Sequence, residues 1–119
     1  MQNPEEIFHH LKEILVPYST DMVVAIDKSD NFYLDTKHVM KNKKPMNFGS
    51  VKINKNYVSF HIMPVYVFPE LLEAISPDLK KRMQGKSCFN FKVTDAKLFQ
   101  ELKELTLAGY GKYKQADYL

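Results

Sequence analysis

Two pairs of short segments rich in β-branched and aromatic residues constrain the fold of this chain most. Residues 22–27 and 32–36 flank the polar turn 28–31, and residues 51–53 and 57–62 flank the polar turn 54–56. Segments of this kind around turn-forming residues predict two β-hairpins. In the second hairpin Val58, Phe60 and Ile62 alternate with polar residues, so one face of the sheet is predicted to be buried.

Helices are predicted at both ends of the chain. Residues 4–16 have apolar side chains at helical spacing, and Pro17 ends this amphipathic helix because proline cannot continue the hydrogen-bond ladder. A second apolar stripe predicts a last helix that follows Thr94 and Asp95 and ends at Gly109. The pattern predicts a single α+β domain over residues 1–119, an antiparallel sheet of about five strands covered on one face by the N- and C-terminal helices.

The segment Gly85-Lys86-Ser87 resembles the end of a phosphate-binding loop, but its context predicts otherwise. Ser76-Pro77-Asp78 is a strong helix start, and the helix is expected to run through Met83. Gly85 then stands where a C-terminal cap glycine would, before an alternating strand over residues 86–93. A phosphate loop needs the reverse order of strand, loop and helix, so this reading is rejected.

The intervening segments are predicted from composition alone. Residues 37–47 are expected to form a lysine-rich connection, and the proline-flanked apolar stretch 63–69 an extended segment. A short helix is expected over residues 70–75, with Pro69 at its start.

Composition narrows the setting in which the chain works. No secretory signal and no apolar run of membrane-spanning length is present among the 119 residues, and Cys88 is the one cysteine, so no internal disulfide can form. A cytoplasmic location and no membrane partner are therefore expected. A monomer or weak dimer is the expected state of association, although the sequence does not determine it. The net charge of +3 is uneven: residues 1–35 carry seven acids and two lysines, whereas residues 36–69 carry six lysines and no acid.

A transient metal site is one candidate function. Glu6, His10 and Glu13 follow i, i+4, i+7 spacing on the first helix, so two carboxylates and an imidazole share a face. Asp21 and Asp27 extend this set if the first strand lies beside the helix. Such ligands suit a divalent or ferrous ion, although surface helices commonly have this pattern without binding metal.

An anionic partner is the alternative. The basic segment 37–55, and in particular Lys37, Lys41, Lys43 and Lys44, offers cations to such a partner, although a solvated loop has the same composition. Nucleic acid is one such partner that this segment could bind, but it is the less expected one, because Arg82 is the one arginine and the lysines are dispersed.

The sheet face opposite the helices is predicted to be partly open and polar. Cys88 and His61 on that face are the minimum for an activated thiolate, but no third orienting group can be named, so an enzyme is not predicted. The residues expected on this open face are Tyr57, Ser59, His61, Cys88 and Asn90.

The stretch FGSVKINKNYVSFHIMPVYVFPELLEAISPDLKKRMQGKSCFNFK, residues 48–92, resembles the hallmark region of small bacterial proteins with the YdhG-like domain. Members of that group are similar to frataxin in architecture, and some are implicated as iron chaperones for iron–sulfur or haem assembly. The resemblance implies a frataxin-like sandwich, weak handling of transient Fe²⁺ without a resident cofactor, and an iron-using assembly protein as partner. It places the iron ligands on an acidic ridge of the first helix and strand, here Glu5, Glu6, His9, His10, Glu13, Asp21 and Asp27.

Overall fold

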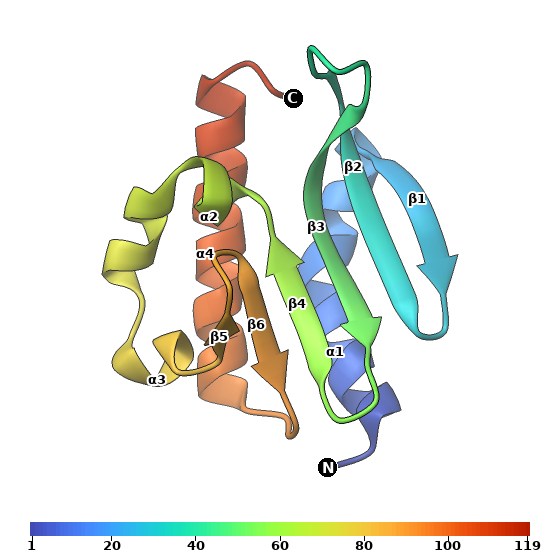
Figure 1. The fold of residues 1–119 in the computed structure, drawn as a ribbon, viewed down its shortest axis with the longest axis vertical. Helices are drawn as coiled ribbons and strands as arrows, with labels where there is room; N and C mark the ends of the chain where they lie inside the picture. The colour runs from blue at the N-terminus through green and yellow to red at the C-terminus, as the bar shows by residue number, and fades with distance from the viewer.

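Six antiparallel strands form one sheet in the order β1-β2-β3-β4-β6-β5, in a computed structural model that describes residues 1–119 (Figure 1). The α+β class is confirmed, with one strand more than expected. Ser29 and Asp30 make the turn between the first two strands, as the sequence predicts. The strands are β1 (Val23–Lys28), β2 (Asn31–Val39), β3 (Pro45–Ile53), β4 (Val58–Ile62), β5 (Met83–Gln84) and β6 (Cys88–Phe91).

Local capping sets the two long helices. The Asn3 side chain accepts a hydrogen bond from the Glu5 amide at 2.9 Å and starts α1 (Pro4–Leu15). Pro17 follows in the 3₁₀ turn η1 (Val16–Asp21). The Asp95 carboxylate accepts from the Leu98 amide at 3.0 Å and starts α4 (Ala96–Gln115). Between β4 and β5 the chain forms the short elements α2 (Pro64–Val67), η2 (Pro69–Ala74) and α3 (Pro77–Lys80).

Helices α1 and α4 lie on the same side of the sheet, behind the strands in Figure 1. The core forms between them: Phe60 and Phe89 of the sheet and Leu11 and Leu102 of the helices are fully buried. The alternation expected for β4 is present, since Val58, Phe60 and Ile62 are buried. The opposite face of the sheet has no helix on it and carries the half-buried polar residues of β4 and β6, Ser59, His61, Cys88 and Asn90.

The prediction that the last helix ends at Gly109 is wrong. Helix α4 continues through Gly109 and Gly111 because the residues beyond them are part of the core. Tyr113 is fully buried, and its hydroxyl donates a hydrogen bond of 2.9 Å to the Asn47 carbonyl in β3. Tertiary packing outweighs the low helix propensity of two glycines here.

The helix predicted through Met83 is also shorter than expected. Helix α3 ends at Lys80, and Met83–Gln84 form β5, which pairs with β6. Gly85 therefore lies in the turn between two strands, where its φ of +79° suits glycine, and not at a helix C-terminus. The order strand, turn, strand still differs from a phosphate-binding loop.

Two further segments differ from expectation. Residues 63–69 are not extended, because Pro64 occupies the first turn of the helix α2. The connection predicted over residues 37–47 is reduced to residues 40–44, since β2 and β3 continue the hairpin on either side. None of the helices combines the length and the apolar composition that a membrane span requires.

Candidate functional site

The open face of the sheet carries a row of polar side chains that crosses five strands and ends at Arg82, the residue before β5. Direct cross-strand pairing aligns Lys28 with Asn31, Asn31 with Lys52, Lys52 with Ser59 and Ser59 with Asn90. The Asn90 amide then donates to the carbonyl of Arg82, the residue before β5, at 2.8 Å. We call this set the cross-strand row: Lys28, Asn31, Lys52, Ser59, Asn90 and Arg82.

The cross-strand row combines three cations with three short polar side chains. Neighbouring strands lie about 4.8 Å apart, so the row spans roughly 24 Å. Lys28, Lys52 and Arg82 are exposed and take part in none of the three ion pairs in the structure. The segments 36–69 and 79–94, which contain β3 to β6, have no acidic residue. From Lys52 to Arg82 the row is therefore a track of positive charge on acid-free segments, whereas Lys28 lies between Asp27 and Asp30 in the sequence.

A polar cleft lies where the cross-strand row meets β5 and β6. Asn54, Tyr57, Ser59, Gln84, Cys88 and Asn90 line a hollow of about 240 Å³. An adjoining hollow of about 340 Å³ shares Tyr57, Gln84 and Asn90 and adds the cations Lys81, Arg82 and Lys92.

Two amides in the cleft hold each other in place. The Asn90 side-chain amide donates to Gln84 Oε1 at 2.6 Å, which leaves the amide nitrogen of Gln84 and the amide oxygen of Asn90 without a side-chain partner. A donor and an acceptor are thus presented together at the cleft.

A second row runs beside the first. Each of its members lies two residues along the chain from a member of the cross-strand row, and so on the same face of the sheet. Two of them, Tyr33 and His61, have planar rings. Residues on one face of a strand are about 7 Å apart, which sets the distance between the rows. We call this set the neighbouring row: Ile26, Tyr33, Ser50, His61, Cys88 and Gln84.

The cysteine and histidine of the neighbouring row are in contact. His61 Nδ1 lies 3.4 Å from Cys88 Sγ and 3.1 Å from Ser87 Oγ. Burial raises the pKa of the Cys88 thiol. Burial lowers the pKa of His61, and a hydrogen bond from the imidazole to the Ser87 backbone opposes this shift. Both shifts favour the neutral thiol and the neutral imidazole over a thiolate–imidazolium pair.

Sequence reasoning placed five residues on this face, and the structure brings four of them into direct pairs. Ser59 lies opposite Asn90 and His61 opposite Cys88, while Tyr57 lines the adjacent cleft. The sequence analysis included Lys52 only as part of the basic segment 37–55, and it missed Lys28, Asn31, Arg82 and Gln84 as parts of the site. Arg82 and Gln84 were missed because the segment before Gly85 has a helix-like pattern, whereas the alignment of Lys28, Asn31 and Lys52 would have followed from the hairpin register.

The predicted lysines lie at the other end of β3. Lys37 belongs to β2, and Lys41, Lys43 and Lys44 form the exposed turn between β2 and β3, at the top of Figure 1. The polar cleft lies at the opposite end of β3, where Asn54 follows the last residue of that strand. The predicted set is therefore a separate basic cluster and not part of the cleft.

The predicted metal ligands have separate partners in the structure. Gln2 donates to Glu6 at 3.2 Å, and His9, not His10, pairs with Glu13 at 3.3 Å. Lys12 pairs with Asp27 at 3.1 Å, and the Tyr110 hydroxyl donates to Asp21 at 2.8 Å.

His10 and Glu13 line an open hollow of about 450 Å³ between α1 and α4, with the His10 ring 6.5 Å from that of Phe99. No three His, Cys, Asp or Glu side chains are gathered as a metal site. The iron site stays a prediction.

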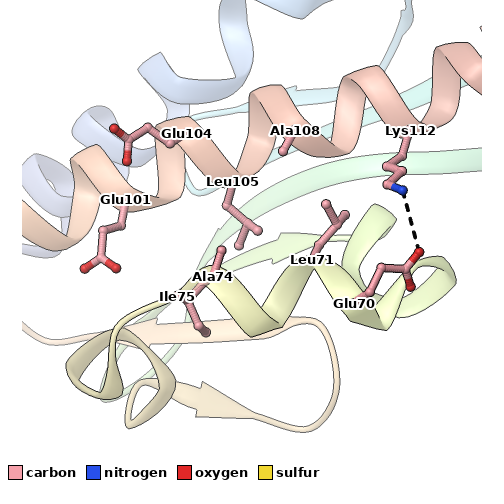
Figure 2. Close-up of a pocket in the computed structure, with 9 residues that line it drawn as sticks. All are labelled: Glu70, Leu71, Ala74, Ile75, Glu101, Glu104, Leu105, Ala108 and Lys112. Carbon is pink, nitrogen blue, oxygen red and sulfur yellow. Dashed lines mark ion pairs between the residues drawn. The ribbon is translucent and has the colours of Figure 1, made fainter.

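A further hollow of about 300 Å³ lies between η2 and α4 (Figure 2). Leu71, Ala74, Ile75, Leu105 and Ala108 give it an apolar lining. At one end Lys112 faces Glu70 at 3.8 Å. Near the other end both carboxylate oxygens of Glu101 accept hydrogen bonds from Ser76. These charged groups attach η2 and the start of α3 to α4. We therefore interpret the residues around the hollow as structural contacts between these elements.

No protein-family model, curated protein or solved structure matches this chain. The resemblance to the YdhG-like group therefore stays a prediction that these comparisons do not test.

Proposed function

We propose that this chain is a binding module for an anionic partner, and that the partner lies on the open face of the sheet. One observation carries the proposal: Lys28, Lys52 and Arg82 stand in a single cross-strand row, exposed and outside the three ion pairs, and the segments 36–69 and 79–94 around Lys52 and Arg82 have no acidic residue. Positive charge without a compensating partner raises the local concentration of anions and speeds their association.

The cleft adds geometry to this charge. Arg82 offers a planar fork of donors that matches phosphate or carboxylate groups, and Lys81 and Lys92 supply point charges around it. The neutral pair of Cys88 and His61 supports a binding role over catalysis by an activated thiolate. The lysine turn Lys41, Lys43 and Lys44 is a second basic surface, and the proposal assigns it no part in the cleft.

Chemical-shift titration with inorganic polyphosphate tests the proposal. The ¹⁵N–¹H spectrum of the whole chain is followed in 20 mM NaCl, with a parallel series at 300 mM NaCl. We expect shifts in β3, β4, β5 and β6 that weaken with salt, because contacts to phosphate release counterions. A double variant, Lys52→Glu with Arg82→Glu, should reduce the affinity at least ten-fold. It should also reduce the slope of log affinity against log salt concentration by about two, because two phosphate contacts are lost.

Matched variants locate the effect. Lys114→Glu reverses an exposed charge on α4, away from the open face, and should leave the affinity within about two-fold of the original. A Lys41, Lys43 and Lys44 triple charge reversal reports on the predicted basic segment. Unchanged affinity in the Lys52 and Arg82 double variant would refute the proposal, and loss confined to the triple variant would move the site to the β2–β3 turn.

A further inference from the structure

The two rows on the open face differ in chemistry, and this difference identifies a class of partner. The cross-strand row offers cations and short polar groups, whereas the neighbouring row offers the planar rings of Tyr33 and His61. Tyr57 adds a third ring at the cleft, on the other side of the cross-strand row, since it lies two residues before Ser59 and His61 two residues after it. A track of positive charge flanked by aromatic rings is the arrangement that holds a sugar–phosphate backbone and stacks its bases.

We propose that the anionic partner is a single-stranded nucleic acid that crosses the strands of the sheet, with phosphates along the cross-strand row and bases over the aromatic rings that flank it. The inference rests on the proposed function, because it requires the open face to bind anions. It also gives the polar groups of the cleft a role. The free donor of Gln84 and the free acceptor of Asn90 suit the edge of a base, which presents donors and acceptors side by side.

The length of the face fits a short segment of single strand. Roughly 24 Å of aligned residues is within the reach of a few nucleotides, the lower end of the range for small single-strand binding domains. A duplex hides its bases from stacking, so it would use the charge of the face and not its rings. Asp35 is the one acid that the paired strands place on this face, two residues from Tyr33, and it faces Asn47 at 3.5 Å. Its negative charge therefore marks the edge of the anion-binding surface along β2, beyond Tyr33.

Fluorescence anisotropy with a 5′-labelled dT₁₂ oligonucleotide tests the inference, with inorganic polyphosphate as a probe of charge without bases. Tyr57→Ala and Tyr33→Ala should each weaken dT₁₂ binding about ten-fold, since stacking on an aromatic side chain contributes at that level. Neither variant should change polyphosphate binding by more than about two-fold. Tyr33→Phe keeps the ring and should retain dT₁₂ binding.

Controls separate the two proposals. Tyr66→Ala removes an exposed aromatic ring on α2 and should have no effect on dT₁₂. If Tyr33→Ala and Tyr57→Ala bind dT₁₂ as the original chain does, or a dA₁₂·dT₁₂ duplex competes as well as the single strand, this inference is overturned while anion binding stands. If neither dT₁₂ nor polyphosphate binds, both proposals fail together.

Discussion

Gly109 in α4 lies directly against the ring of Pro64 in α2. A Cβ atom at Gly109 would stand 2.7 Å from Pro64 Cβ and 3.0 Å from Pro64 Cγ, closer than two carbon atoms pack. The proline ring is rigid and is itself buried. The absence of a side chain at Gly109 therefore sets how closely α2 approaches α4.

Gly109→Ala should lower the free energy of unfolding by about 1–3 kcal/mol, because the helix pair must separate to admit the methyl group. Gly111→Ala is the matched control, since nothing lies within 4 Å of its Cβ position. That change should stabilise the chain by about 0.5–1 kcal/mol through helix propensity. Urea denaturation measures both, and equal effects at the two glycines would refute the close contact.

The glycines also show where sequence reasoning reaches its limit. The helical and alternating patterns of Ile7, Leu11, Phe60 and Phe89 predict the layers because each pattern is local. The extent of α4 is not local: it depends on Tyr113 reaching the Asn47 carbonyl, a partner 66 residues away. The same reason explains why Lys28 and Arg82 could not be placed on one row from the sequence, since their alignment requires the order of all six strands.

His61 should make stability depend on pH. Burial lowers the pKa of His61 in the folded chain, so below about pH 6.5 the unfolded chain binds more protons at this residue than the folded chain does. Stability from this group is present above that pH and is lost as the pH falls. We expect the urea midpoint to decrease between pH 7.5 and 5.5, and the decrease to be smaller in His61→Gln.

The pH series ends at 5.5 because a second group, Asp35, affects stability at lower pH. Burial raises the pKa of Asp35, which acts in the opposite direction at lower pH because the folded chain then binds the extra proton. His10→Gln, an exposed histidine on α1, is the control and should keep the original pH dependence. A pH dependence that survives in His61→Gln at full size would show that another group causes it.

Cys88 should be an unreactive thiol. Its pKa is raised by burial, so the thiolate fraction at pH 7.4 is smaller than in a free peptide. We expect the folded chain to react with 5,5′-dithiobis(2-nitrobenzoate) several-fold more slowly than the chain unfolded in urea. A folded-state rate above the unfolded one would contradict this and restore the candidate nucleophile at Cys88 and His61.

Iron handling predicts a different set of responding residues from anion binding. Lys12 forms an ion pair with Asp27, and the Tyr110 hydroxyl donates a hydrogen bond to Asp21. A metal cation would have to displace these partners before it could bind either carboxylate. On α1, by contrast, only the exposed histidine His9 competes for Glu13. If Fe²⁺ binds, we therefore expect its paramagnetic broadening to begin at the His9–Glu13 turn of α1 and to reach Asp21 and Asp27 at higher concentration.

An anaerobic ¹⁵N–¹H titration with Fe²⁺ makes this measurement, with Zn²⁺ as a control for unspecific ligation. Lys12→Ala frees the Asp27 carboxylate and should strengthen Fe²⁺ binding several-fold, whereas alanine at Glu6, His10 and Glu13 together should abolish it. The Lys52 and Arg82 charge reversal should leave it unchanged, because those residues lie on the opposite face of the sheet. Amides of α1 that stay sharp up to millimolar Fe²⁺ would show that the iron prediction is wrong at this ridge.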